Sequence, residues 1–206
     1  GNVADNGGGV FVDGDGEASL ENATISGNRA SQFGGGVLVS SRINVRSSTV
    51  VSNLAAQGGG INNGGGDLIG DGFVFLASSI VASNLTGGNC AGTITSNGGN
   101  VENANTCQLT QLSDQPGTNP LLGPLASNGG PTQTHALLAG SPAQDQASCT
   151  ETDPCPPVDQ RGVARPVFAN SDAGAYESEL TPGGGGPPAC VGPTERPVPA
   201  DYDTWI

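Results

Sequence analysis

The sequence predicts an all-β fold, a right-handed parallel β-helix in which each repeat of the chain forms one coil of a solenoid. Three glycine triplets, which begin at Gly7, Gly34 and Gly58, are spaced by 27 and 24 residues and predict about three coils. A second motif runs in step with them as "ATISGN", "TVVSN" and "IVASN". Ser, Thr, Val, Gly and Asn dominate these repeats, which favours strands and turns over helices. The L-x-x-L-x-L pattern of a leucine-rich horseshoe is absent from the sequence.

The glycine triplets are expected at the corners of the coils. At a corner the backbone turns sharply and neighbouring coils approach closely, and glycine permits a positive φ and removes the Cβ that would clash. A row of stacked asparagines is expected beside them, at Asn28, Asn53 and Asn84, because stacked amides can bond along the stack. The predicted structural corners are Gly34, Gly35, Gly36, Gly58, Gly59 and Gly60.

The repeats and the cysteines together divide the chain into three parts. Residues 1–88 read as repeat coils, 89–180 as a C-terminal β-helix and cap module, and 181–206 as a Pro/Gly-rich tail. One histidine and no CxxC pair argue against a zinc site, so we expect two local disulfides and an oxidising compartment. These disulfides are Cys90–Cys107 and Cys149–Cys155, and Cys190 is either a free thiol or an intermolecular link.

The charge balance excludes two classes of partner. The chain of 206 residues has six Arg, no Lys and 19 acidic residues, for a net charge of -13. Such a chain is repelled by nucleic acid and by anionic membrane. No segment is long and apolar enough to span a bilayer, and the composition favours solubility outside the cell.

Two sets of motifs resemble known bacterial families. The pairing of GGG[VI] with [IV]xxN is similar to the repeats of polymorphic outer membrane proteins and related autotransporter passengers. "NPLLGPLASNGGPTQTHALLAGSPAQDQ" (residues 119–146), "VDQRGVARP" (158–166) and "DAGAYE" (172–177) resemble the C-terminal module of the choice-of-anchor Q family. The resemblance implies a right-handed β-helix exported to the bacterial surface or medium, and the family has no established catalytic residues. Gln144 and Ala173 depart from its pattern, and no recognisable anchor follows Glu177.

A polysaccharide lyase or glycoside hydrolase is the rival function, because such β-helix enzymes cluster acids on one exposed sheet. Aligning the strands after the corners stacks Phe11 with Leu38 and Asn62, Val12 with Val39 and Asn63, and Asp13 with Ser40 and Gly64. Only the last row contains an acid, which argues against glycan cleavage there.

Other residues could form a metal-binding or catalytic site, but each also has a structural interpretation. Asp13, Asp15 and Glu17 in "DGDGE" could hold Ca²⁺, although they lack EF-hand spacing and a solvated acidic turn is preferred. His135 is expected to be a packing residue. Asp159, Arg161, Asp172 and Glu177 could form an active site, but a salt-bridged cap over the last coil is preferred. The sequons at Asn22 and Asn84 are expected to be coincidental.

The sequence starts inside a repeat, so its first coil is expected to present an open edge. The chain is then either a fragment of a longer β-helix or a processed subunit whose edge a neighbour covers, which would propagate head to tail as a filament. The tail residues Tyr202, Trp205 and Ile206 could dock in such an assembly.

We therefore expect a non-catalytic structural or adhesive protein of the bacterial surface, without a cofactor, that contacts itself, a glycan, or a host or neighbouring cell. A polysaccharide-active enzyme and a glycan- or Ca²⁺-binding module are the alternatives.

Overall fold

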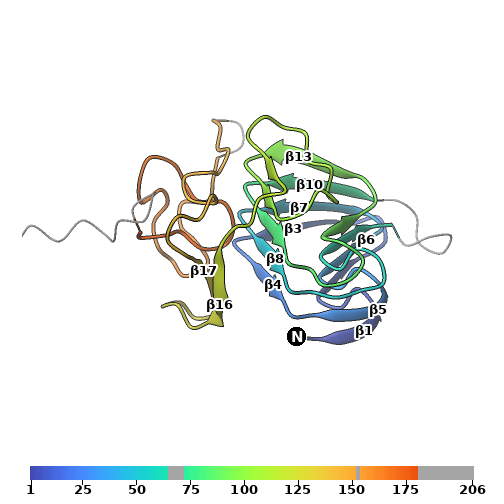
Figure 1. Cartoon of the computed structure of the whole chain (residues 1–206). Helices are drawn as coiled ribbons and strands as arrows, with labels where there is room; N and C mark the ends of the chain where they lie inside the picture. The colour runs from blue at the N-terminus through green and yellow to red at the C-terminus, as the bar shows by residue number, and fades with distance from the viewer. Residues whose placement is uncertain (65–71, 152–153, 181–206) are drawn as a thin grey trace, which may run out of the picture.

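The computed structural model describes residues 1–64, 72–151 and 154–180, and every regular element within these ranges is a β-strand (Figure 1). Most strands belong to three parallel sheets. One sheet holds β2 (Val10–Val12), β6 (Val37–Val39), β9 (Ile61–Asn63) and β12 (Cys90–Ala91). The second holds β3 (Glu17–Glu21), β7 (Arg42–Arg46), β10 (Phe73–Ala77) and β13 (Ile94–Gly98). The third holds β4 (Thr24–Ser26), β8 (Thr49–Val51), β11 (Ile80–Ala82), β14 (Val101–Glu102) and β15 (Gln115–Pro116).

The chain passes through the three sheets in turn and then adds the next layer of strands beside the previous one. Figure 1 shows β3, β7, β10 and β13 stacked in this way. Within the described residues, the β2 and β3 sheets each have four strands, one more than the three predicted coils. The extra layer begins after Gly87, Gly88 and Asn89, which replace a glycine triplet. A short parallel pair, β1 (Val3–Asn6) and β5 (Arg29–Phe33), joins the first two layers.

The predicted register after the corners is confirmed. Phe11 pairs with Leu38 and Leu38 with Asn62, and Val39 pairs with both Val12 and Asn63. β-branched and aliphatic side chains alternate towards the interior, where their stacked rows exclude water and form one apolar core. Fully buried members of that core are Val37, Val39, Ile43, Val45, Val50, Ile61 and Leu76.

The glycine triplets lie where neighbouring layers approach closely. Gly34 and Gly58 have φ values of 61° and 58°, a backbone conformation that suits glycine. A Cβ on Gly35 would lie 2.5 Å from the carbonyl oxygen of Gly59, so only glycine allows the layers to approach this closely. Four consecutive N–H groups of residues 34–37 donate to the carbonyls of residues 57–60, at 2.8–3.2 Å.

The predicted asparagine row forms a hydrogen-bonded amide column inside the stack. Asn28 Nδ2 donates to Asn53 Oδ1 at 3.0 Å, and Asn53 Nδ2 donates to Asn84 Oδ1 at 3.1 Å. The column continues through Asn89, whose Nδ2 donates to the buried carboxylate of Glu102 at 3.2 Å. Each amide also accepts the main-chain N–H of the layer before it, so the column satisfies buried backbone groups.

A second polar column lies at the corner before the third sheet. Main-chain N–H groups donate to Ser48 Oγ, Ser79 Oγ and Asn100 Oδ1 in successive layers. This column ends on Asp114, which accepts the N–H and the amide of Asn100. Both columns therefore run in one direction and end on an acidic residue at the last layer.

Residues 103–114 cover the last layer of the stack. The Cys90–Cys107 disulfide ties this segment to β12, and Cys107 and Leu109 join the apolar core. Glu102 accepts the N–H groups of Thr106 and Cys107. The prediction that Asp159, Arg161, Asp172 and Glu177 cap the last coil is wrong in its location, because this nearer segment closes the end.

The C-terminal module packs instead against the side of the stack, over the sheet that contains β4 and β8 (Figure 1). Its contacts reach three successive layers: Asn22 Nδ2 donates to Val158 O, Ala175 N donates to Thr49 Oγ1, and Gly174 N donates to Ser78 O. The module contains the antiparallel pair β16 (Leu122–Ala126) and β17 (Thr134–Leu137) and the Cys149–Cys155 disulfide. Cys190, Tyr202, Trp205 and Ile206 lie outside the described residues.

Candidate functional site

A buried cluster of charged residues holds the C-terminal module together. Arg165 pairs with Glu177 at 2.8 Å, and Arg161 pairs with Asp159 at 2.8 Å while its guanidinium lies 3.6 Å from the ring centroid of Tyr176. Glu177 also accepts the N–H groups of Val167 and Asp172, at 2.9 Å each. The carboxylates are therefore bonded to backbone and arginine, which fits the cohesion of an irregular segment better than acid–base chemistry.

Burial changes the acidity of two members of this cluster, Asp172 and Arg165. Burial, together with the negative charge of Glu177, raises the pKa of Asp172 to about 7. Hydrogen bonds from the N–H groups of Asp145 and Ser178 oppose the shift. Burial likewise lowers the pKa of Arg165, against the attraction of Glu177.

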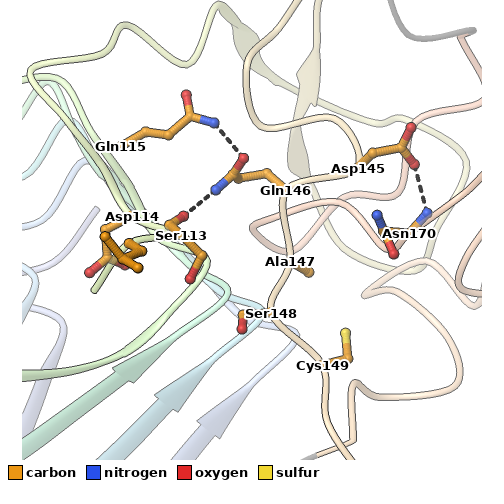
Figure 2. A pocket seen from close by; sticks show the side chains of 10 residues that line it. Ser113, Asp114, Gln115, Asp145, Gln146, Ala147, Ser148, Cys149 and Asn170 are labelled. Atoms are coloured by element: carbon orange, nitrogen blue, oxygen red, sulfur yellow. Dashed lines mark hydrogen bonds between the residues drawn. The ribbon is translucent and has the colours of Figure 1, made fainter. Parts of the chain in front are cut away.

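His135 is a packing residue, as expected. It is 8% exposed, its Nδ1 lies 2.8 Å from Gly123 O, and its Nε2 lies 2.9 Å from Ser26 Oγ, so both ring nitrogens have a hydrogen-bond partner. A serine bonded to a histidine is also the arrangement of a nucleophile and its base. Neither residue lines the hollow in Figure 2 or the two hollows beside Phe73. The bond joins β17 of the module to β4 of the stack.

The acidic turn at residues 13–17 divides its carboxylates between different partners. Asp13 Oδ1 accepts from Ser40 Oγ at 2.8 Å and from Gly14 N at 2.7 Å, and these bonds lower the pKa of Asp13 below its usual value. Glu17 Oε1 accepts from Asn44 Nδ2 at 2.8 Å. Across the described residues, no three His, Cys, Asp or Glu side chains gather in a metal-binding group.

A hollow of about 490 Å³ lies between residues 112–115 and the C-terminal module. Figure 2 shows the side chains that line it. Its polar side chains already form hydrogen bonds with one another or with the backbone. Gln115 Nε2 donates to Gln146 Oε1, Gln146 Nε2 donates to Ser113 O, and Asp145 Oδ1 accepts from Asn170 N at 3.0 Å. Because these groups are satisfied across the hollow, they stabilise the junction of the two parts rather than present free donors to a ligand.

The outward side of β3, β7 and β10 has a different character, and we call it the aromatic face. It consists of Glu17, Arg42, Asn44, Phe73 and Phe75, which occupy paired positions on adjacent strands. Phe73 is 61% exposed, and the Arg42 guanidinium lies 5.4 Å and 4.8 Å from the ring centroids of Phe73 and Phe75. A hollow of about 410 Å³ beside this face is lined by Glu17, Arg42 and Phe73 and by the turn residue Asp15.

The aromatic face was not predicted, because the rows aligned in the sequence belong to the strands directly after the glycine corners. The residues in question lie one sheet further along the chain. The signal in the sequence is the alternation in "RINVR" and "FVFLA", where Arg42, Asn44, Phe73 and Phe75 occupy outward positions.

Comparison with known proteins adds no relative. The chain matches no protein-family model, no curated protein and no solved structure. In the part of the chain that the structure describes, there is also no helix long and apolar enough to cross a membrane.

Proposed function

We propose that this chain is a right-handed parallel β-helix that serves as a non-catalytic structural or adhesive protein at the bacterial surface or in the medium. The repeat motifs and the C-terminal module that resemble polymorphic outer membrane proteins and the choice-of-anchor Q family motivate the proposal. The observation that carries it is the amide column. The neutral side chains of this column bond each layer to the next and end on buried Glu102. Such bonding would make a rod of stacked layers rigid.

The hydrogen bonding of its carboxylates supports a non-catalytic role. Glu102, Asp114 and Glu177 each accept several hydrogen bonds from backbone or amide groups. A general acid or base needs a free lone pair or proton that faces a substrate, and these carboxylates use theirs to hold loops.

The two disulfides support export, because such bonds persist in oxidising compartments. Cys90–Cys107 is buried within the stack, whereas Cys149–Cys155 lies in the module. The first ties the irregular residues 103–114 to β12, and the second closes a short loop of the module.

A head-to-tail filament is a narrower form of the proposal. In this chain β2, β3 and β4 are the end strands of their sheets, and either a second copy or an upstream coil of a longer chain could pair with them. The opposite end is covered by residues 103–114, so a neighbour would have to contact that segment instead of pairing strands with the last layer. Uniform monomers seen by electron microscopy would overturn the filament form.

Antibody staining of intact producing cells tests the location. Staining without permeabilisation, or recovery of the chain from the medium with both disulfides formed, would support the proposal. A signal that appears only after lysis would overturn it. Turnover is tested separately, by incubating the purified chain with polysaccharides and measuring new reducing ends and unsaturated products, and either product would overturn the non-catalytic assignment.

A further inference from the structure

The aromatic face combines one exposed ring, that of Phe73, and one half-buried ring, that of Phe75, with planar polar groups. Phe73 and Phe75 lie two positions apart on β10, so their side chains leave the same side of the sheet about 6.6 Å apart along the strand. An exposed phenylalanine side chain is costly to leave in water, and exposed Phe73 lines a hollow of about 410 Å³. Apolar surface of this kind, next to a few polar groups, is the composition of a small-molecule site.

Arg42 presents unused donors at this face. Within the described residues, no hydrogen-bond or salt-bridge acceptor contacts its guanidinium, which instead lies over the two rings. The rings thus hold a planar fork of five N–H donors in place without consuming them.

Acceptors lie immediately beside these donors. Glu17 is the register partner of Arg42 on β3, and it keeps one oxygen free, since Asn44 donates to Oε1 alone. Asp15 also lines the hollow and is exposed. A ligand in this hollow therefore meets both donors and acceptors at the edge of an apolar surface.

The charge of the chain decides between ligand classes. In the hollow a polyanionic glycan would meet Glu17 and Asp15 beside the single lining cation Arg42, on a chain with a net charge of -13. A neutral sugar ring, by contrast, has an apolar C–H face that can lie on an aromatic ring and hydroxyls that each donate and accept. The mixture of Arg42 donors and carboxylate acceptors matches such hydroxyls.

We infer that the aromatic face is a binding site for neutral pyranose oligosaccharides, with Phe73 as the stacking platform and Arg42 and Glu17 as hydroxyl partners. The inference rests on the proposed adhesive function and gives that function a ligand class. Binding occurs along the outward side of β3, β7 and β10, and the sugar remains intact.

The test uses the full chain and a panel of neutral hexasaccharides, namely cellohexaose, maltohexaose, mannohexaose and chitohexaose, with hexagalacturonate as the acidic counterpart. Saturation-transfer NMR detects contact, and titration calorimetry measures Kd. We expect at least one neutral member to bind with Kd below about 1 mM. Phe73→Ala should weaken that binding about tenfold, equivalent to about 1.4 kcal/mol, and Arg42→Gln should weaken it as well.

The matched control is Phe11→Ala, because Phe11 is a 46% exposed phenylalanine on β2, outside the aromatic face. It should leave Kd unchanged. Circular dichroism of each variant verifies the fold, and Arg42→Gln gives a second test should Phe73→Ala unfold. The inference is overturned if no neutral member binds, if hexagalacturonate alone binds, or if Phe11→Ala weakens binding as much as Phe73→Ala. None of these results changes the surface-staining outcome, so failure of this site is distinguishable from failure of the proposed location.

Discussion

Replacement of Asn53 by alanine tests whether the amide column holds the layers together. Asn53 is fully buried, and its Oδ1 accepts from Asn28 N at 2.9 Å and from Asn28 Nδ2 at 3.0 Å. Its Nδ2 donates to Ile25 O at 2.9 Å and to Asn84 Oδ1 at 3.1 Å. Asn53→Ala removes all four bonds at once.

The size of the loss follows from the groups left behind. Two donors of Asn28 lose their acceptor in a buried place, and each orphaned buried group costs about 1–3 kcal/mol. Asn84 Oδ1 keeps a bond from the main-chain N–H of residue 53, so its loss is smaller. We expect the free energy of unfolding to fall by about 4 kcal/mol, a large share of the usual 5–15 kcal/mol of a domain.

Urea unfolding followed by circular dichroism measures this quantity. The control is Asn97→Ala, because Asn97 is an exposed asparagine of β13, and its loss should stay within about 0.5 kcal/mol. A loss below about 1 kcal/mol for Asn53→Ala, or one no larger than that of the control, would refute the claim that the column is a main stabilising element.

Three further outcomes are expected. Gly36→Ala should lower the free energy of unfolding by about 2–3 kcal/mol in urea, since its Cβ would lie 2.6 Å from a carbonyl oxygen of the next layer, whereas Gly16→Ala meets nothing within 4 Å and should be nearly neutral. Replacing Cys90 and Cys107 together by alanine should cost about 3 kcal/mol, because the disulfide joins residues 17 positions apart, and intact mass should show the loss of one disulfide. Stability should fall as pH rises from about 4 to 7, by up to about 4 kcal/mol, because folded Asp172 keeps its proton to about pH 7 while the unfolded chain releases it near 3.9. Asp172→Asn should flatten this slope in urea titrations at each pH.

Each of these outcomes has a contrary result. Equal stability of the two glycine variants would remove the steric explanation of the corners. An unchanged midpoint after loss of Cys90–Cys107 would mean that residues 103–114 stay in place without it. A slope that is the same in Asp172→Asn and in the original chain would assign the pH dependence to other groups.

The repeated features of the fold could be predicted from the sequence because they recur at a local spacing. The triplets at Gly34 and Gly58 and the asparagines at 28, 53 and 84 mark equivalent places in successive repeats, and the structure brings each set together. The pairing of Cys90 with Cys107 followed from proximity along the chain in the same way.

The remaining features depend on contacts that no local spacing encodes. The C-terminal module reaches Asn22 and Thr49 over more than a hundred residues, so its place on the side of the stack could not be read from its own motifs. The aromatic face joins Arg42 of one repeat to Phe73 of the next, across a repeat of irregular length. The fourth layer was missed because Gly87, Gly88 and Asn89 differ from a triplet.

The corner hydrogen bonds also give the stack a dipole along its axis. At residues 34–37 four consecutive N–H groups point towards the next layer, and their carbonyls point back, so the peptide dipoles add along the axis as they do in an α-helix. The positive end of such a row is the last layer, where Glu102 and Asp114 terminate the two columns. The interior rows thus consist of neutral amides and hydroxyls, and negative charge is placed at the end where the summed field favours an anion. A repeat can be added to this stack of layers without adding any buried charge.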